Sequence, residues 1–519
     1  MPQKRRKSSR RPVVFRKLLI ANRGEIAVRI ARACRLLGIS PVAVCSEADR
    51  NALHARVADE THVIGPAPST ASYLNIEAIL EAAKRSGADA IHPGYGFLAE
   101  NPDFAEACRE AGVVFVGPGA KAMRALGNKI EARKRMAAAG VSVVPGLEKS
   151  GLTCRDLQVW AEGVGYPILL KAAAGGGGRG MRIVRRPEEL EAALAGARSE
   201  ARSSFGDDTV YPERYLERAR HIEIQVLIDQ SGKGISLGER ECSIQRRHQK
   251  LVEEAPSPAV DAAERTRLGR MALKVCEAAG YVNAGTVEFL RDGEGRFYFL
   301  EMNARLQVEH PVTEMVTGID LARAQIEVAS GAPLPVPRGP LFPRGWAVEC
   351  RIQAEDPMQG FRPSPGRINL FRPPGGPNVR LDAGVCEGDE VSLHYDSLLA
   401  KLIVWGPTRD LAIRTMASAL SEFRITGVRT TLSFHRRVME DPEFRRGAID
   451  TGYVERLLSR SVPPPDAAVE AVAFMAAAHL SRSAAPRPLP AASSIDAWRL
   501  AGRRVGAGRD LPRSPWRER

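Results

Sequence analysis

A run of glycines between two apolar segments is the first feature of the sequence that could bind a ligand. Lys171 ends one apolar segment, and Gly175–Gly178 follow it. Consecutive glycines let neighbouring backbone N–H groups point into one concavity, which suits a polyphosphate, and Lys171 adds a positive charge. The run lacks the Gly-Lys-Ser/Thr of a Walker A loop, so a different nucleotide-binding fold is needed. The alternative, a flexible linker, is disfavoured because the run lies within a pair of strands.

Two glutamates project from one face of a predicted β-hairpin. With Asp292–Gly295 as a four-residue turn, Glu288 opposes Phe299 and Glu301 lies diagonally across from it. Two such acids would repel each other and lose hydration, whereas one or two Mg²⁺ ions bridging them to nucleotide phosphates remove both penalties. Asn303 can add a neutral oxygen. The alternative is a pair of acids neutralised by nearby arginines.

Two dense polar blocks flank this hairpin. One is QRRHQK at residues 245–250, and the other is EMNARLQVEHP at residues 301–311. Transfer of a phosphoryl group to a small anion needs such a mixture: Arg for bidentate oxygen contacts, Lys for developing charge and Glu to take a proton. Solvated surface charge is the competing interpretation for residues 245–250.

The elements that position these residues alternate between strands and helices. A βαβ opening is predicted, with the turn Asn22–Gly24 at a helix N-terminus, but without the GxGxxG of a dinucleotide fold. Apolar periodicity predicts strands at Lys17–Ala21, Val42–Cys45, Ala90–His92, Ile168–Ala172, Gly180–Val184, His221–Ile228 and Ile235–Glu239, a hairpin at Thr286–Glu301, and helices at Glu25–Leu37, Tyr73–Ser86, Lys129–Ala139, Ala262–Ala279 and Asp410–Phe423. Pro-rich Ala332–Pro343 is the predicted internal linker, and a β-rich region follows from Trp346 to Trp405.

The composition excludes several classes of protein. The 519 residues are 44% apolar and 26% charged, as in an ordinary globular protein of three or four domains. No stretch reaches the ~18 apolar residues of a membrane helix, and no signal-peptide core follows the basic N-terminus, so we expect neither a membrane span nor Sec export. The eight cysteines form no CxxC pair and no His/Cys cluster, which favours a reducing, cytoplasmic compartment over a disulfide framework or a zinc site.

The net charge of +14 belongs to the ends of the chain. Residues 1–17 contribute +8 and residues 456–519 contribute +6, so the body between them is formally neutral. The N-terminal MPQKRRKSSRR has no apolar periodicity, and we expect a solvated, disordered arm. Binding of nucleic acid, a membrane surface or an acidic partner by the basic ends is the alternative. With a neutral body, nucleic acid is not an expected partner.

Several long motifs closely resemble biotin carboxylase, an ATP-grasp ligase, over about residues 14–457. They include KLLIANRGEIAVRIARACRLLG, IHPGYGFLAEN, KAAAGGGGRGMRIV, ERECSIQRRHQKLVEEAPSP, FLEMNARLQVEHPVTEMVTGIDL and AVECRIQAEDP. The resemblance implies an α/β and α+β multidomain fold. Its parts are a basic arm (1–13), an N-terminal Rossmann-like α/β (pre-ATP-grasp) domain (14–128), an ATP-grasp domain (129–331) with a mobile glycine-rich lid at about 145–216, a β-rich C-terminal biotin carboxylase domain (345–457) and a Pro/Ala/Arg-rich tail (459–519).

The resemblance also implies roles for individual residues. The implied ATP contacts are Lys129, Lys171, Gly176, Gly177, Gly178, Glu213, Tyr215, Leu216, His221, Gln245 and His248. Glu288, Glu301 and Asn303 match the ligands of Mg²⁺ or Mn²⁺, with two ions expected. Lys250, Arg305, Gln307 and Val308 match the bicarbonate pocket, with Glu309 as the base and Arg305 as a further catalytic residue. Arg351 matches the residue that stabilises the biotin enolate.

The implied reaction is the ATP- and bicarbonate-dependent carboxylation of biotin through carboxyphosphate. No Met-Lys-Met biotinylation motif occurs in the chain, and we expect no carboxyltransferase after residue 458. The expected partners are therefore a separate biotin carboxyl carrier protein and carboxyltransferase subunits of a multisubunit acetyl-CoA or acyl-CoA carboxylase, with the chain itself a homodimer. A two-subunit pyruvate carboxylase is the alternative. The sequence departs from the family at Gly119, where some members have lysine, and at Ala173-Ala174, where Ser-Gly is common.

Two rival functions fit the sequence less well. Another carboxyphosphate-forming ATP-grasp ligase, such as one that makes carbamoyl phosphate, is disfavoured by the Arg305–His310 block and by Arg351. A non-catalytic scaffold or nucleic-acid binder that uses the basic ends is disfavoured by the intact acid pair and lysines. The structural alternative for Arg351 is an ion pair with Glu349 or Glu355.

Overall fold

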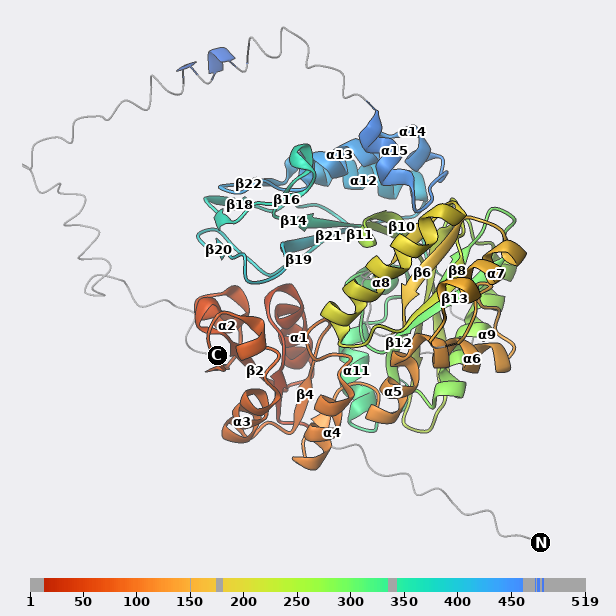
Figure 1. The fold of residues 1–519 in the computed structure, drawn as a ribbon. Helices are drawn as coiled ribbons and strands as arrows, with labels where there is room; N and C mark the ends of the chain where they lie inside the picture. Colours follow the sequence, from red (N-terminus) through yellow and green to blue (C-terminus); the bar gives the residue numbers. More distant parts are fainter. Residues whose placement is uncertain are drawn as a thin grey trace, which may run out of the picture. The chain divides into compact units, whose positions relative to one another are not determined.

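The structure is a computed structural model that describes residues 14–149, 151–173, 181–334 and 343–460, with residues 472, 474–476, 478 and 479. Gly176–Gly178, most of the predicted linker, the N-terminal arm and most of the tail lie outside the described residues. Residues 1–457 belong to one compact unit, and the tail from Leu458 belongs to a second. The predicted site residues that the structure describes all belong to the first unit. Figure 1 labels the helices and strands of this unit.

The N-terminal sheet consists of five parallel strands in the order β3-β2-β1-β4-β5. The predicted βαβ opening is confirmed, with Gly24 in the left-handed turn that starts the first helix. The strands are β1 Lys17–Ile20, β2 Ser40–Cys45, β3 Glu60–Val63, β4 Ala90–His92 and β5 Val114–Phe115, and the helices are α1 Gly24–Leu36, α2 Leu53–Val57, α3 Ile76–Ser86, α4 Pro102–Glu110 and α5 Ala120–Gly127.

Asn22 joins the two loops that leave the neighbouring strands β1 and β4. Its amide Nδ2 donates hydrogen bonds to the carbonyls of Pro93 (2.7 Å) and Tyr95 (2.8 Å). A Cβ at Gly94 would lie 2.9 Å from this nitrogen, so only glycine fits there. Ligands of open parallel sheets bind at the carboxyl ends of the strands. This clamp therefore holds the segment from Tyr95 at the edge where a ligand is expected.

A small antiparallel sheet in the order β7-β6-β8 follows helix α6, Lys129–Ala138. Two helices cover it, and the first begins with a capping box between Thr153 and Asp156. Its buried core contains Leu157, Ile168 and Leu194. The elements are β6 Ile168–Ala172, β7 Arg182–Val184, β8 Val210–Arg214, α7 Cys154–Val164 and α8 Leu190–Phe205.

One antiparallel sheet of eight strands, in the order β13-β12-β9-β10-β11-β14-β21-β19, runs through the rest of this unit. Helix α9 begins at an Asp261–Glu264 capping box, has Gly280 as its C-cap, and packs on β9 and β10. The elements are β9 Arg220–Ile228, β10 Gly234–Arg246, β11 Gln249–Ala255, α9 Ala262–Ala279, β12 Asn283–Arg291, β13 Phe297–Asn303, α10 His310–Thr317, α11 Leu321–Ala329, β14 Trp346–Gln353, β19 Val379–Ala383 and β21 Leu398–Gly406.

Helices α12 and α13 bury an apolar face against β14 and β21. The remaining elements are short. They are α12 Arg409–Glu422, α13 Leu432–Glu440, α14 Pro442–Arg445 and α15 Tyr453–Ser459, and the strands β15 Glu355–Asp356, β16 Arg362–Pro363, β17 Gly366–Arg367, β18 Leu370–Arg372, β20 Glu390–Val391 and β22 Arg424–Thr426.

The register of the β12–β13 hairpin corrects the sequence prediction. Glu288 pairs directly with Glu301, whereas Phe299 pairs with Phe289. The loop has five residues rather than four, because the Asp292 carboxylate accepts hydrogen bonds from the Glu294 and Arg296 amides. An irregularity next to Glu288 then shifts the pairing by one more residue. The two acids are therefore closer neighbours than the predicted diagonal pair.

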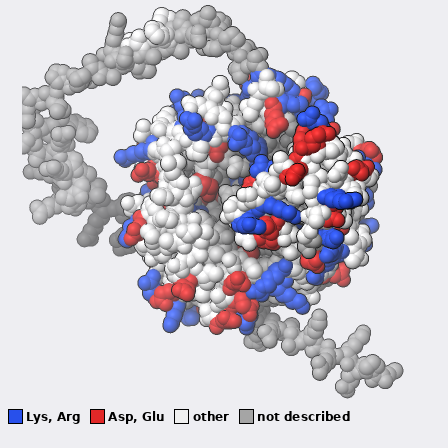
Figure 2. All heavy atoms as spheres, viewed as in Figure 1, with Lys and Arg blue, Asp and Glu red and all other residues white. Residues whose placement is uncertain are grey.

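The surface and the cysteines carry less information about function. On the face shown in Figure 2, basic and acidic side chains are interspersed rather than gathered in a single patch. All eight cysteines are free thiols, and six of them are buried. None of the described helices is long and apolar enough to cross a membrane.

Candidate active site

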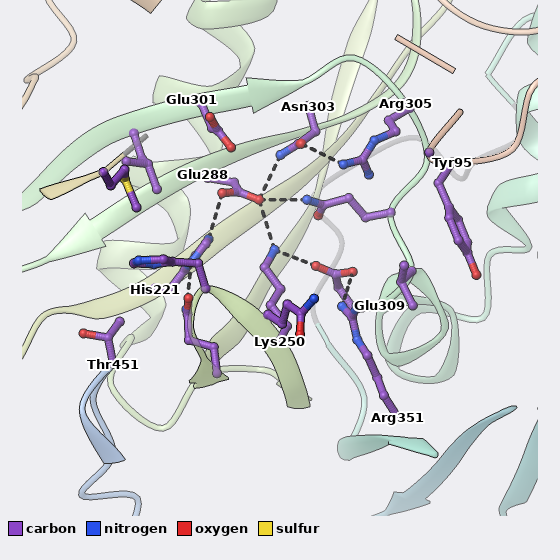
Figure 3. A pocket seen from close by; sticks show the side chains of 18 of the residues that line it. Tyr95, His221, Lys250, Glu288, Glu301, Asn303, Arg305, Glu309, Arg351 and Thr451 are labelled. Carbon is purple, nitrogen blue, oxygen red and sulfur yellow. Dashed lines mark hydrogen bonds and ion pairs between the residues drawn. The ribbon is translucent and has the colours of Figure 1, made fainter. Parts of the chain in front are cut away.

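A cavity of about 750 Å³ brings the predicted site residues together (Figure 3). Its walls come from loops of the N-terminal sheet, from the small sheet, from the strands β9–β13, and from residues between Arg351 and Thr451. Every predicted site residue that the structure describes lines it: Lys129, Lys171, Glu213, Tyr215, Leu216, His221, Gln245, His248, Lys250, Glu288, Glu301, Asn303, Arg305, Gln307, Val308, Glu309 and Arg351. Gly176, Gly177 and Gly178 lie outside the described residues.

A buried ion-pair cluster holds Lys171 at one end of the cavity. Its Nζ lies 3.0 Å from Glu213, whose other oxygen lies 2.7 Å from the guanidinium of Arg133. Burial would raise the pKa of Glu213, but Lys171 and Arg133 outweigh it and lower that pKa. Glu213 therefore orients Lys171. Sequence reasoning missed Arg133, although its position four residues after Lys129 on α6 was a usable signal.

The acid pair differs in environment between its two members. Glu288 is buried and accepts hydrogen bonds from Lys250 (3.0 Å), Asn303 (2.8 Å) and Gln307 (2.8 Å), while His221 lies 3.0 Å away. Burial would raise the pKa of Glu288, but Lys250 and His221 hold it well below its usual range. Glu301 is more exposed and has Lys129 at 3.6 Å. Glu288 therefore stays ionised at neutral pH despite its burial.

Lys250 is the centre of the charged network. Its Nζ lies 2.5 Å from Glu223, 3.0 Å from Glu288 and 2.6 Å from Glu309. Burial would lower the pKa of Lys250, but these three carboxylates hold it well above its usual range. Glu223 also accepts from Arg240 at 2.5 Å. The buried group of His221, Glu223 and Glu288 is therefore balanced by cationic side chains.

Glu309 lies between two cations at the start of α10. One of its oxygens is 2.6 Å from Lys250 Nζ, and the other is 3.0 Å from the guanidinium of Arg351. Burial would raise the pKa of Glu309, but Lys250 and Arg351 hold it well below its usual range. Arg351 also donates to Glu253 at 2.6 Å. Its partners are therefore Glu253 and Glu309, and not the predicted alternatives Glu349 and Glu355.

Arg305 is held by the N-terminal domain. Its Nε donates to Glu100 (2.9 Å), which also accepts from the backbone amide of Ala304, and its Nη2 donates to Asn303 (3.0 Å). Glu100 is a second residue that sequence reasoning missed as part of the site. No local pattern could reveal this contact, because the two residues are 205 positions apart.

Arg240 is a third missed residue. It is fully buried, and it donates to Glu223, Gln225 (2.7 Å) and Gln307 (2.8 Å). These contacts fix the Gln307 amide so that its nitrogen faces Glu288. Alternation along β10 would have assigned Arg240 to one face of a strand, but it could not show that this face is buried.

The turn between β10 and β11 presents His248 to the cavity. Arg247 and His248 both have positive φ, at 48° and 66°, as a two-residue type I′ turn requires. Burial and the nearby Lys171 lower the pKa of His248. The turn is strained for side-chain-bearing residues, and it places a neutral imidazole next to Lys171.

Three family models match consecutive parts of the chain. They are the biotin carboxylase N-terminal domain over residues 14–123, the carbamoyl-phosphate synthase L chain ATP binding domain over residues 128–336, and the biotin carboxylase C-terminal domain over residues 349–456. Together they cover most of the residues that the structure describes. The fold and the charged cavity define the class as an ATP-grasp ligase.

Known proteins narrow this class. One pyruvate carboxylase subunit of Methanothermobacter thermautotrophicus is 54% identical over 85% of this chain and 90% of that protein. Biotin carboxylase 1 of Bacillus subtilis is 53% identical over 85% of this chain and 98% of that protein. The biotin carboxylase domain dimer of Hydrogenobacter thermophilus 2-oxoglutarate carboxylase, solved with MgADP, ADP and bicarbonate, is 46% identical, with a TM-score of 0.83 over 86% of this chain and 99% of that one. The chain belongs to the biotin carboxylase family.

Proposed function

We propose that the chain carboxylates biotin on a separate carrier protein, with ATP and bicarbonate as co-substrates. The observation that carries this proposal is the Glu309 carboxylate, buried between Lys250 at 2.6 Å and Arg351 at 3.0 Å in the cavity. A site that deprotonates a small anion next to a nucleotide needs an ionised base surrounded by fixed cations. The family and the bicarbonate-bound relative support the same assignment.

Glu309 acts as the base in the first step. It takes the proton of bicarbonate, and the resulting oxyanion attacks the γ-phosphoryl group of ATP, giving carboxyphosphate and ADP. A second negative charge entering the pocket raises the proton affinity of Glu309, because like charges favour protonation. Lys250 and Arg305 balance the bicarbonate charge, and Gln307 and the Val308 backbone complete the pocket.

The donor set at the acid pair fits Mg²⁺. Glu288 and Glu301 are direct cross-strand partners, and Asn303 lies next to them on the same strand as Glu301, so all the donors are the hard oxygens that this ion prefers. Mg²⁺, or Mn²⁺ in its place, neutralises the phosphate charge of ATP when bound. Lys129, Lys171, Gly176, Gly177 and Gly178 hold the phosphates, and Glu213 keeps Lys171 in position. Tyr215, Leu216, His221, Gln245 and His248 contact the rest of the nucleotide.

Arg351 acts in the second step. Carboxyphosphate releases CO₂ and phosphate, the phosphate takes the N1 proton of biotin, and the deprotonated ring attacks CO₂. Negative charge then develops on the ureido oxygen, where a preorganised guanidinium stabilises the transition state more than the neutral ground state. Arg351 comes from β14, so this group belongs to a different part of the chain from the nucleotide contacts.

The carrier, the carboxyltransferase and the final acceptor lie outside this chain in the proposal. We assign the chain to a cytoplasmic, homodimeric component of an acetyl-CoA or acyl-CoA carboxylase. The identity to the Methanothermobacter pyruvate carboxylase protein favours a 2-oxo acid as the alternative acceptor. Purification of the chain with its native carrier and carboxyltransferase, followed by assays with acetyl-CoA, propionyl-CoA and pyruvate, distinguishes the two.

The test of the biotin carboxylase activity is ADP release measured with Mg²⁺, with and without bicarbonate, and with and without free biotin. We expect hydrolysis that depends on bicarbonate and is stimulated by biotin, with carboxybiotin formed in the same reaction. Equal ADP release with and without bicarbonate would overturn the proposal. Hydrolysis that depends on bicarbonate but forms carbamoyl phosphate with ammonia would favour the rival ligase.

A further inference from the structure

Two buried glutamates on neighbouring strands of the large sheet have no role in the reaction described above. Glu253 on β11 and Glu349 on β14 are direct cross-strand partners, and both are fully buried. Directly opposed side chains on adjacent antiparallel strands have Cβ atoms about 4.5–5.5 Å apart and point to the same face. The two carboxyl groups are therefore neighbours beneath helix α10.

Three of the four oxygens of this pair lack a partner among the described residues. Glu253 Oε1 accepts from Arg351 at 2.6 Å. No described residue donates a hydrogen bond to Glu253 Oε2 or to either oxygen of Glu349. The next pair on the same face is Ala255 with Ala347, which packs with Val312 and Val316 of α10. Apolar side chains thus border the pair on one side.

The nearby cations are already engaged. Lys401 is opposite Arg351 on β21, and its Nζ lies 2.9 Å from the Val308 carbonyl oxygen and 3.0 Å from Glu25. Arg351 is shared between Glu253 and Glu309. An ionised Glu349 would therefore be a buried charge with no hydrogen-bond donor from the described residues, which costs several kcal/mol.

One shared proton removes this difficulty. A carboxylic acid on one residue can donate to the carboxylate of the other, which gives a partner to two of the three unpartnered oxygens and leaves a single negative charge on the pair. Burial raises the pKa of both groups. Repulsion from Glu253 adds to the rise for Glu349, and repulsion from Glu309 adds to it for Glu253. The two carboxyl groups therefore titrate as a pair and not as independent residues.

We propose that Glu253 and Glu349 share one proton at neutral pH and act as a positioning pair for Arg351. The singly charged pair holds the guanidinium from one side while Glu309 holds it from the other. Loss of the shared proton makes the pair doubly negative, and the guanidinium is then drawn toward β11 and away from Glu309. This inference rests on the proposed function, because the biotin-facing role of Arg351 belongs to that function.

The charged and titratable groups around the pair are known from the structure. Arg351 and Lys401 face it from β14 and β21, Glu309 from the start of α10, and Lys250 from β11. The thiols of Cys242 on β10 and Cys350 on β14 also interact with it, and burial raises the pKa of both well above the usual range. Both thiols therefore stay neutral over the pH range of the test.

The first experiment measures thermal stability of the full chain against pH for wild type, Glu349→Gln and the control Glu254→Gln. The folded pair binds its proton more tightly than the unfolded chain does, so it stabilises the fold at low pH and loses this contribution as pH rises through the folded pKa. Glu349→Gln keeps an N–H donor for Glu253 but cannot ionise. Its melting temperature should therefore rise relative to wild type between pH 5 and pH 8.

Glu254→Gln is a matched control, because Glu254 is a buried glutamate on the same strand. It points to the opposite face, where it accepts from Arg409 and Trp346. This variant should lose stability without the pH-dependent gain. A constant offset between Glu349→Gln and wild type over the whole range would overturn the shared proton.

The second experiment reads the proton and the position of Arg351 separately. The infrared difference between wild type and Glu349→Gln at pH 7.5 should show loss of a protonated carboxyl band, and loss of an ionised carboxylate band instead would refute the proposal. Glu253→Gln should reduce carboxybiotin formation by about 10- to 100-fold at unchanged bicarbonate-dependent ADP release, because it removes one of the two groups that align Arg351. Equal loss of both activities would show a merely structural role.

The two proposals fail in distinguishable ways. If the wild-type chain showed no bicarbonate-dependent ATP hydrolysis, the proposed function would be overturned. The melting and infrared measurements would still test whether Glu253 and Glu349 share a proton. Wild type with full activity but no difference in either physical measurement would overturn the positioning pair alone. Glu349→Gln should also keep carboxybiotin formation at pH values where the wild-type activity declines.

Discussion

Arg351 is the residue at which the two half-reactions should separate. Its guanidinium lies at the Glu309 side of the cavity and comes from a strand that does not contribute to the acid pair. Arg351→Ala should reduce carboxybiotin formation by about 10²–10³, because it removes one preorganised donor from a developing oxyanion. Bicarbonate-dependent ADP release should continue, uncoupled from carboxylation. Both products are measured in one reaction.

A matched control for this variant is Arg409→Ala. Arg409 is a partly buried arginine that forms an ion pair with a different buried glutamate, Glu254, and it does not line the cavity. Its removal should lower the melting temperature and leave the ratio of carboxybiotin to ADP unchanged. A parallel fall of both products in Arg351→Ala, with the same loss of stability as in the control, would contradict the assigned role.

The two members of the acid pair should respond differently to neutralisation. Glu288 is buried against Lys250 and His221, and these cations outweigh burial and lower the pKa of its carboxylate. The ionised carboxylate therefore stabilises the fold above pH 5, and this contribution is lost in acid. Glu288→Gln should therefore destabilise the nucleotide-free protein at pH 7 by about 3–5 kcal/mol. Glu301 is more exposed and its ion pair with Lys129 is long at 3.6 Å, so Glu301→Gln should change stability by less than about 0.5 kcal/mol.

Both variants should raise the Mg²⁺ concentration needed for half-maximal ADP release, because each removes an anionic oxygen ligand. Thermal melts without nucleotide and Mg²⁺ titrations of activity measure the two effects. The sequence predicts that neutralising either acid relieves repulsion, whereas the contacts of Glu288 with Lys250 and His221 predict a loss of stability for Glu288→Gln. An unchanged Mg²⁺ requirement in Glu301→Gln would show that this residue is not a ligand.

The sequence identified many of the residues that line the cavity, but not others such as Glu25 and Tyr95, and not the residues that hold the lining in place. Motifs such as Arg305–Glu309 are contiguous, so their members could be found by type and spacing. Glu100, Arg133 and Arg240 act through partners far away in the chain. For Glu100 and Arg240 a single sequence contains no signal of these long-range pairs, whereas Arg133 could have been found from its position four residues after Lys129 on α6.

At the scale of the element, the β10–β11 turn is strained by residues that carry side chains. Arg247 has φ of 48° in a type I′ turn, where asparagine or glycine is preferred. Arg247→Asn should therefore stabilise the protein by about 0.5–1 kcal/mol, as seen by thermal or denaturant unfolding. Gln249→Asn in the adjoining strand, where the backbone is extended, is the control and should give no gain. Equal effects at both positions would exclude relief of strain.

Several of the longer elements could be predicted from apolar periodicity, whereas most of the short strands and helices were not. The predictions for Ile168–Ala172, Ala90–His92 and Ala262–Ala279 agree with the observed bounds. The hairpin register was wrong because it depends on hydrogen bonds that one aspartate makes within a five-residue loop and on an irregularity next to Glu288. Alternation in the sequence predicts which residues share a face of the strand, but it does not predict the loop length that fixes the pairing register.

At the scale of the whole molecule, buried histidines should make stability depend on pH. Burial lowers the pKa of His54 and His435 to about 4 and that of His92 to about 3. A histidine whose pKa is lower in the folded state than in the unfolded chain stabilises the fold above pH 6.5. This contribution is lost as pH falls, because the unfolded chain takes up the proton first. Each of these three histidines should lower the free energy of unfolding by about 2 kcal/mol at pH 5.

Denaturant unfolding between pH 7.5 and pH 5 tests this expectation. His221 opposes the trend, because Glu288 outweighs the effect of burial and raises its pKa. His54→Gln should make the decline less steep, since glutamine does not titrate. Unfolding free energy that stays constant over this range in wild type would show that these histidines are not buried in neutral form.

The continuous eight-stranded sheet has a consequence for how such enzymes can be recombined. Two family models meet between residues 336 and 349, yet β11 and β14 on either side of that boundary are hydrogen-bonded neighbours. The boundary between the two family models is therefore not a boundary between separate sheets. A chimaera joined there would have to match four cross-strand pairs, from Val252–Cys350 to Ala255–Ala347, between its two parents. Catalytic halves of this family should accordingly be inherited together rather than exchanged as interchangeable modules.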